Sequence, residues 1–225
     1  MNLYIVHGWI YDISPWETVA KTLAEQGITA EILRVPGLTE PSDQIWDIKK
    51  YVHWADHNIP DGVVALGHSN GGRILMNLLS ERPTKLKGLI LLDSAGIYDR
   101  SVKRSTMKVV AKAFSPLKHV KPLRKLVHRA IGASDYDKAP ENMKHTLHNM
   151  IMSDKQLDPT KVIVPTHIIW GDADISTPLR HGQELHRLIK GSRLIVKKGW
   201  PHSRYLEHPE ELAHVIAESA QELDA

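Results

Sequence analysis

Near the middle of the chain, residues 67–71 read GHSNG, which fits the pattern G-x-S-x-G and places Ser69 between two glycines. The apolar run before this pattern is typical of a buried strand, and the residues after it are typical of a helix. A sharp turn from strand to helix strains the backbone of its middle residue and exposes that residue's hydroxyl. Gly67 and Gly71 are small enough for such a turn to close, and Gly72 lets the helix approach the sheet. The pattern predicts that Ser69 is a nucleophile.

Glycine-rich turns between a strand and a helix also bind phosphate groups. The spacing of the glycines here does not fit G-x-G-x-x-G, and no GK[ST] follows them. The context of the turn therefore favours nucleophilic catalysis over phosphate binding.

A serine hydroxyl is a poor nucleophile unless a nearby base removes its proton. His202 lies in the segment WPHSRYLEHPEEL, on the expected loop between the last strand and the last helix. This loop and the serine turn lie at the carboxyl ends of the strands, where the active sites of α/β proteins collect. His208 directly precedes a helix and is interpreted as a surface or capping residue, and His214 falls inside that helix. We expect His202 to be the base.

The base needs a carboxylate that fixes its tautomer and stabilises its charged form. The segment IIWGDADISTP places Asp172 and Asp174 just beyond a strand and before His202 in the chain. The order serine, acid, histidine favours Asp174 as this carboxylate. Asp172 is interpreted as a residue that shapes the loop through hydrogen bonds to nearby amides. Asp93, at the end of an earlier strand, is the alternative acid.

Attack on an acyl carbonyl creates a tetrahedral oxyanion, which needs two backbone N–H donors. Asn70, directly after the serine, is expected to supply one of them. The loop after the first strand, with the sequence HGW, is expected to supply the other from Trp9. The Trp9 side chain would then border the pocket, and His7 is interpreted as a loop anchor rather than a second base.

The elements that must hold these residues alternate between strand and helix, which favours a parallel sheet flanked by helices on both faces. The expected strands cover residues 3–6, 28–35, 62–66, 89–92, 162–170 and 193–197. The expected helices cover residues 14–27, 43–58, 73–81, 179–189 and 209–223. Ser14 is expected to cap the first of these helices, with Pro15 at its first position.

A long interruption separates the fourth and fifth strands. Residues 97–160 are too many for an ordinary connection and include helical stretches, so we expect a helical cap there. Residues 1–96 and 161–225 form the expected core. The cap contains thirteen Lys/Arg and six Asp/Glu, a net charge of +7, in a chain with +3 overall. This charge suggests an anionic substrate or an acidic carrier protein as partner, although a merely solvated basic surface is the plainer interpretation.

Composition narrows the function classes. The chain has no cysteine, which excludes disulfides and thiolate chemistry, and its 14 histidines are scattered without the spacing of metal ligands. A net charge of +3 is too small to indicate nucleic acid binding. No apolar run is long enough to span a membrane, and the first residues lack the pattern of a signal peptide. We therefore expect a cytoplasmic protein without a metal or transmembrane segment.

Four segments, HGW, GHSNGG, WGDADISTP and PHSRYLEHPEEL, occur in an order that resembles the α/β-hydrolase superfamily in its branch of small serine esterases. The resemblance covers nearly the whole chain apart from details of the insertion. It implies the α/β-hydrolase fold, a helical cap inserted before the strand that leads to the catalytic acid, an acyl-enzyme mechanism and no cofactor. Two departures are visible: two strands that open larger members are expected to be missing, and Asn70 stands where many relatives have Met or Gln.

Together these features predict a carboxylesterase-like serine hydrolase that cleaves a small acyl ester through an acyl-enzyme on Ser69. A serine nucleophile argues against the haloalkane dehalogenase and epoxide hydrolase branches, which use aspartate. Acyltransferases, thioesterases and carbon–carbon bond hydrolases share the triad and stay open as alternatives, because specificity lies in the cap. A binding protein of this fold that has lost catalysis is a further alternative, which the intact triad disfavours.

Overall fold

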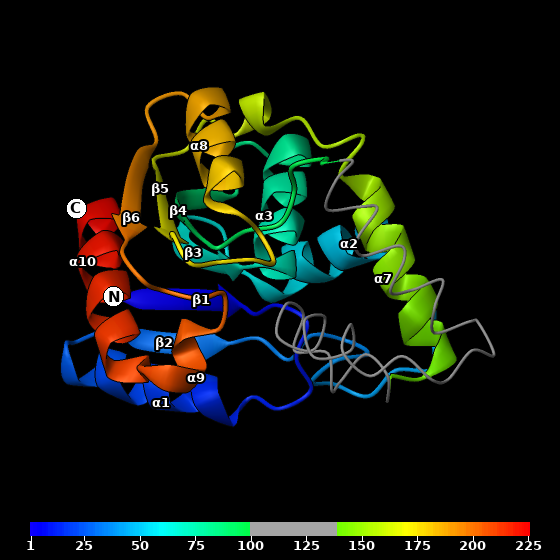
Figure 1. Cartoon of the computed structure of the whole chain (residues 1–225), viewed down its shortest axis with the longest axis horizontal. Coiled ribbons are helices and arrows are strands. Elements are labelled where there is room, and N and C mark those ends of the chain that lie inside the picture. Colours follow the sequence, from blue (N-terminus) through cyan, green and yellow to red (C-terminus); the bar gives the residue numbers. More distant parts are fainter. Residues whose placement is uncertain (100–138) are drawn as a thin grey trace.

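Six parallel strands in the order β2-β1-β3-β4-β5-β6 form the centre of the structure, a computed structural model that describes residues 1–99 and 139–225 (Figure 1). Every neighbouring pair of strands in this sheet runs parallel. The strands are β1 (Asn2–Val6), β2 (Thr29–Ile32), β3 (Val63–His68), β4 (Leu86–Leu92), β5 (Thr166–Gly171) and β6 (Arg193–Lys197). The predicted sheet is confirmed.

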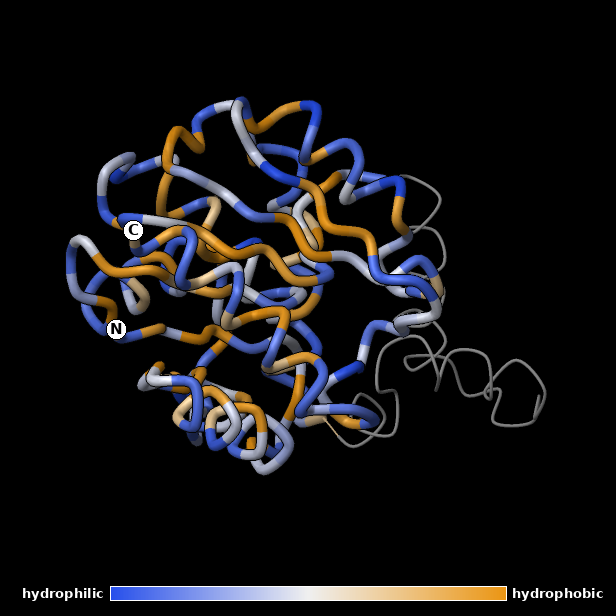
Figure 2. Tube along the Cα trace, turned by 90° about the vertical axis from the view of Figure 1, so that its left-hand side faces the viewer, coloured by the Kyte–Doolittle hydropathy of each residue, from blue (hydrophilic) through white to orange (hydrophobic). Residues whose placement is uncertain are grey.

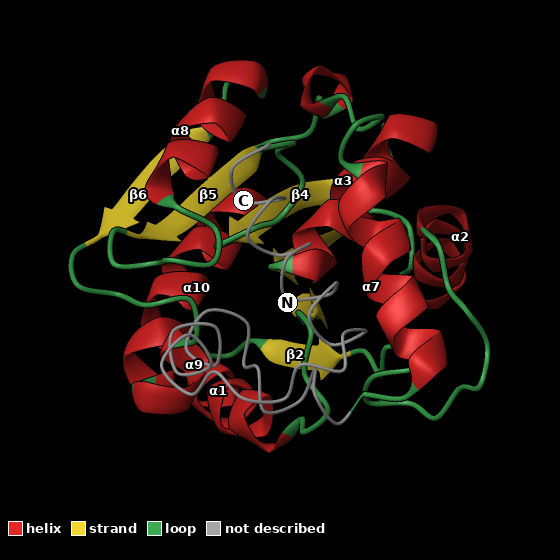
Figure 3. Ribbon diagram, turned by 45° about the vertical axis from the view of Figure 1, so that its right-hand side comes forward, coloured by secondary structure: helices red, strands yellow, loops and turns green. Residues whose placement is uncertain are grey.

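Helices cover both faces of this sheet, as Figure 3 shows. One face carries α1 (Ser14–Glu25), the short α9 (Arg204–Glu207) and α10 (Pro209–Asp224). The other carries α2 (Ile48–Asn58), α3 (Asn70–Glu81) and α8 (Leu179–Leu188), with α7 (Glu141–Ser153) outside α2. A single 3₁₀ turn, η1 (Pro159–Lys161), precedes β5 among the described residues.

The strands separate two hydrophobic cores because successive side chains along a strand point to opposite faces. In β4, Ile90 and Leu92 pack toward α1 and α10, whereas Leu89 and Leu91 pack toward the helices of the other face. All four side chains are essentially inaccessible to solvent. Figure 2 shows the resulting pattern, with hydrophobic strands in the interior and hydrophilic segments outside. Burial on both faces explains why the inner strands β3, β4 and β5 are largely apolar in the sequence.

Several predicted boundaries were wrong, and at the first two helices local hydrogen bonds decide where the element begins. Ser14 does not cap α1: its hydroxyl donates to the Asp12 carboxylate, and the capping position falls on Ile13.

The second helix begins at Ile48 rather than at residue 43, because the Asp47 side chain accepts the N–H of Lys50 and caps the helix. The fifth strand begins only at Thr166, after η1, and the second strand covers only residues 29–32.

The order of the strands makes a topological switch point at the carboxyl ends of β1 and β3. These strands are neighbours, but the chain leaves β1 toward α1 on one face and leaves β3 toward α3 on the other. Ligands of open α/β sheets bind where connections diverge in this way. The loop with HGW and the serine turn both begin at this point, so the fold places the predicted site where the two connections diverge.

The predicted cap, residues 97–160, is described only at its two ends, and residues 100–138 lie outside the described residues. The helical character expected near Glu141 is confirmed by α7. This helix is docked on the loop before α2: the side chains of Asn142 and Asn149 donate to backbone carbonyls there, and Thr146 accepts the N–H of Trp46. The division into core and cap stays a prediction.

No helix within residues 1–99 and 139–225 combines the length and the apolar character that crossing a membrane requires.

Candidate active site

Ser69 sits in a sharp turn between β3 and α3 with a backbone φ of 51°, a left-handed conformation that non-glycine residues seldom adopt. The surrounding glycines are required by close packing. A Cβ on Gly67 would lie 2.4 Å from the Cα of Gly72, and a Cβ on Gly71 would lie 1.9 Å from the carbonyl oxygen of Val6. A Cβ on Gly72 would meet the side chain of a serine after β4. The turn therefore has the strain and the crowding that the sequence pattern predicts.

The structure brings His202 to this serine. The Nε2 atom of His202 lies 3.0 Å from Ser69 Oγ, although 133 residues separate them. Its Nδ1 atom lies 2.7 Å from Oδ2 of Asp174. Because a carboxylate only accepts, Nδ1 carries the proton and Nε2 is free to accept from the hydroxyl. This arrangement can take a proton from Ser69 and hold the resulting imidazolium against a carboxylate.

Asp174 is held as an ionised acceptor by every bond it makes. Its Oδ1 accepts the backbone N–H groups of Ser176 at 2.7 Å and Thr177 at 3.0 Å. Its Oδ2 accepts the Thr177 hydroxyl at 2.6 Å as well as the His202 ring. The Asp174 side chain is fully buried. Thr177 was not singled out from the sequence, although a threonine three residues after an aspartate is a common turn pattern.

Electrostatics match this division of roles. Burial raises the pKa of Asp174, but the charge of His202 and the hydrogen bonds from His202 and Thr177 outweigh it, so the pKa is lowered overall. Burial lowers the pKa of His202, and the charge and hydrogen bond of Asp174, with help from Asp93, outweigh it, so that pKa is raised. Each group thus stabilises the charged form of the other.

The two other carboxylates have different partners. Asp172 accepts the N–H of Gly199 at 2.6 Å and so joins the loop after β5 to the loop that carries His202, which is the loop-shaping role expected of it. Asp93 is fully buried, and its Oδ1 accepts the N–H of Gly171 at 2.9 Å. Burial and the charge of Asp174 raise the pKa of Asp93 well above its ordinary value. Among the described residues, the carboxylate in hydrogen-bond contact with His202 is Asp174.

Of the two predicted oxyanion donors, Asn70 directly follows the serine, and Trp9 belongs to a loop that packs on the serine turn. Asn70 is the first residue of α3, where a backbone N–H has no partner inside the helix and the helix dipole favours negative charge. The loop with Trp9 packs directly on the turn, since a Cβ on Gly8 would lie 2.9 Å from the Cβ of Ser69. His7 anchors this loop: its Nδ1 donates to the Gly8 carbonyl and its Nε2 accepts from a threonine hydroxyl, both at 2.8 Å.

A buried ion pair beside the serine turn was not predicted. Arg73, on the first turn of α3, binds both carboxylate oxygens of Asp154 at 2.6 and 2.8 Å. Asp154 ends α7, and both side chains are less than a tenth exposed. Arg73 also donates to Oδ1 of Asn70 at 2.5 Å. The pair therefore ties the end of the predicted cap to the residue that follows the serine.

Within the described part of the chain, no cluster of three or more His, Cys, Asp or Glu side chains is arranged to hold a metal ion. The other histidines considered from the sequence lie away from the serine. His208 directly precedes α10, and His214 lies exposed on that helix with its ring bonded to the carbonyl of Glu210.

The alpha/beta hydrolase family matches this chain over residues 3–215. The chain belongs to this family. Among curated proteins, it is 27% identical to the pimeloyl-[acyl-carrier protein] methyl ester esterase of Neisseria meningitidis, over 94% of this chain and 90% of that protein. It is 24% identical to the enzyme of the same name from Pseudoalteromonas atlantica, over 93% of this chain and 90% of that protein.

Solved structures show the same fold. A thermophilic esterase from Thermogutta terrifontis aligns with a TM-score of 0.71 at 16% identity, over 100% of this chain and 91% of that one. A monoacylglycerol lipase from Paleococcus ferrophilus aligns with a TM-score of 0.70 at 18% identity, over 99% of this chain and 94% of that one. The predicted α/β-hydrolase fold is confirmed, and so is the predicted class of enzyme, a serine hydrolase that acts on ester bonds.

Proposed function

We propose that Ser69, His202 and Asp174 are the nucleophile, the base and the orienting acid of this esterase. The observation that carries the proposal is the chain of two hydrogen bonds, 3.0 Å from Ser69 Oγ to His202 and 2.7 Å from His202 to Asp174. Nucleophile, base and orienting group within hydrogen-bond reach of one another are the signature of an activated serine.

In the proposed mechanism, His202 Nε2 takes the proton from Ser69 as the hydroxyl oxygen attacks the acyl carbonyl. The backbone N–H groups of Trp9 and Asn70 stabilise the oxyanion that forms. His202 then gives the proton to the leaving alcohol, and the acyl group stays on Ser69 as an ester. A water molecule, deprotonated by His202, releases the acid in a second attack. Asp174 orients the imidazole and stabilises its charged form in both steps.

The substrate that we propose is an acyl methyl ester presented on an acidic acyl carrier protein. Two observations support this choice. The curated relatives that match over nine-tenths of their length are named for pimeloyl-[acyl-carrier protein] methyl ester, and hydrolysis of that ester releases methanol and a free carboxylate. The insertion at residues 97–160 concentrates positive charge, with thirteen Lys/Arg against six Asp/Glu. An excess of positive charge of this size would attract an acidic carrier.

The pH dependence of kcat/KM is expected to identify the base. Only neutral His202 accepts a proton, and its pKa is raised above the ordinary value of a histidine, mainly by Asp174 against the effect of burial. Activity should therefore rise with pH, and its inflection should lie above that ordinary value. Asp174→Asn removes the carboxylate that favours the charged ring. The inflection should move to lower pH, and kcat should fall by roughly 10⁴-fold because the ring loses its correct tautomer. Hydrolysis of p-nitrophenyl acetate across this pH range measures both effects. An unchanged inflection in Asp174→Asn would contradict the assignment of the acid.

Added salt is expected to lower kcat/KM for the carrier-bound substrate but not for a simple ester. Electrostatic attraction speeds association by roughly 10–10³-fold and is screened by added salt. The kcat/KM for methyl pimeloyl-acyl carrier protein should therefore fall as NaCl is added, while the kcat/KM for neutral p-nitrophenyl butyrate should stay constant. Equal responses of the two substrates would contradict the proposed carrier and leave the esterase chemistry unaffected.

A further inference from the structure

His68 occupies a variable position of the G-x-S-x-G pattern, directly before Ser69, and the mechanism above gives it no role. It is the last residue of β3 and only 2% exposed. A buried polar ring usually makes hydrogen bonds that offset the free-energy cost of removing it from water. The contacts of this ring therefore indicate what it does.

One hydrogen bond of His68 reaches the base itself. Its Nε2 lies 3.1 Å from the backbone carbonyl oxygen of His202, a residue 134 positions later in the chain. A carbonyl oxygen only accepts, so the proton of His68 is on Nε2. Its Nδ1 has no hydrogen-bond partner among the described residues, and it faces Gly8, where an added Cβ would lie 2.9 Å from it. The tautomer of the ring is thus fixed by its partner.

Aromatic packing holds the same ring in place. Its centroid lies 4.9 Å from the ring of His202, 5.6 Å from Trp16 of α1 and 5.2 Å from Tyr205 of α9. Trp16 and Tyr205 also stack on each other, with centroids 5.1 Å apart. His68 therefore contacts the base itself, α9, which follows the base in the chain, and α1. It is itself the last residue of β3, the strand that leads to the nucleophile.

The ring is also kept neutral. Burial, together with the neighbouring charge of His202, lowers the pKa of His68 to about 3, against the hydrogen bond to the His202 carbonyl and the attraction of Asp174. A second positive ring at this distance would disfavour the imidazolium that His202 forms during catalysis. A neutral donor at this position supports the base without that cost.

We propose that His68 is a positioning residue: its neutral imidazole donates through Nε2 to the backbone carbonyl of His202 and so fixes the base relative to Ser69. The inference rests on the esterase mechanism proposed above. The side chain of His202 is oriented by Asp174, and its backbone is oriented by His68. The two contacts together determine where Nε2 of the base meets the hydroxyl.

Two substitutions distinguish the effect of the N–H donor from the effect of the volume that the ring fills. His68→Phe keeps an aromatic ring but removes the N–H, and His68→Gln places an amide N–H near the position of Nε2. A misplaced base slows chemistry more than substrate binding, since small displacements of reacting groups cost up to about 100-fold. We expect His68→Phe to lower kcat by roughly 10–100-fold with KM nearly unchanged, and His68→Gln to recover most of the lost kcat.

A control variant tests whether a loss of stability alone would lower kcat. Ile216→Val removes one methyl group from the same hydrophobic core, on α10, and should lower the melting temperature while leaving kcat unchanged. If the wild-type protein is active and His68→Phe retains its full kcat, the proposed role of His68 is wrong. A kcat of His68→Gln as low as that of His68→Phe would overturn it as well. An inactive wild-type protein would instead contradict the proposed esterase function.

The wild-type protein offers a test that does not depend on how the variants fold. Nitrogen chemical shifts of ¹⁵N-labelled histidine distinguish a protonated from an unprotonated ring nitrogen. We expect His68 to show a protonated Nε2 and an unprotonated Nδ1 throughout the pH range in which His202 titrates. A proton on Nδ1, or a doubly protonated ring at neutral pH, would overturn the proposal.

Discussion

Replacing Ser69 by alanine is expected to lower kcat by roughly 10⁴–10⁶-fold and to leave the fold intact. The variant loses the atom that forms the acyl-enzyme, and His202 then has no hydroxyl to deprotonate. The residual rate should come from the oxyanion donors and from substrate binding alone, because these do not depend on the serine. Steady-state hydrolysis of p-nitrophenyl butyrate measures the loss, and circular dichroism with a thermal melt verifies the fold.

Ser80→Ala is the matched control for this substitution. Ser80 lies on the same helix, α3, and its hydroxyl bonds the carbonyl of Met76 inside that helix. It should retain wild-type turnover. If Ser69→Ala also retained wild-type turnover, the proposed nucleophile would be wrong.

The second large effect is expected at the buried ion pair. Asp154→Ala should lower the free energy of unfolding by about 3–5 kcal/mol, because it leaves the Arg73 guanidinium buried without its counter-charge. Such a loss is a large fraction of the stability of an ordinary domain. Urea denaturation followed by intrinsic fluorescence measures it. Activity should fall too, since Arg73 also holds the side chain of Asn70.

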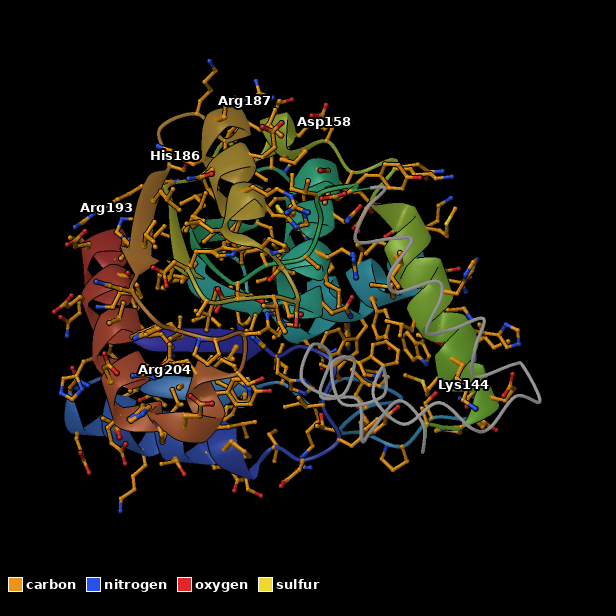
Figure 4. All side chains as sticks on the ribbon, in the orientation of Figure 1. Lys144, Asp158, His186, Arg187, Arg193 and Arg204 are labelled. Carbon is orange, nitrogen blue, oxygen red and sulfur yellow. The ribbon has the colours of Figure 1, made fainter. Side chains whose placement is uncertain are left out.

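Two further variants test the cause of this effect. Arg187 lies on the outer side of α8 (Figure 4). It pairs with Glu184 at the solvent-exposed surface, so Arg187→Ala should leave the free energy of unfolding nearly unchanged. The double variant Arg73→Met/Asp154→Leu removes both charges and should recover most of the stability that Asp154→Ala loses. A cost below about 1 kcal/mol for Asp154→Ala would show that the pair is not buried as described.

Features encoded in short stretches of sequence were predictable. The serine turn joins a buried strand, a helix and three glycines within residues 63–81, and each of these glycines meets a backbone or side-chain atom that excludes a Cβ. The inner strands β3, β4 and β5 were recognisable because burial on both faces makes them largely apolar. The choice of Asp174 over Asp172 and Asp93 rested on chain order and on position relative to the strands, and the 2.7 Å contact with His202 agrees with it.

Features that depend on distant segments were not predictable. Arg73 and Asp154 are 81 residues apart, and nothing near either residue in the sequence indicates the other. The bond from His68 to the carbonyl of His202 uses a backbone acceptor, which leaves no trace in residue type. Asp47 was missed as the cap of α2 because several polar residues before that helix could have served.

The most direct test of the account is reaction of the protein with a fluorophosphonate probe, followed by mass mapping of its peptides. Fluorophosphonates react with serines that a neighbouring base has activated. The account predicts one labelled peptide, modified at Ser69, in the wild-type protein and no labelling of Ser69→Ala. A well-folded wild-type protein that is not labelled, or one that is labelled on another residue, would contradict the account.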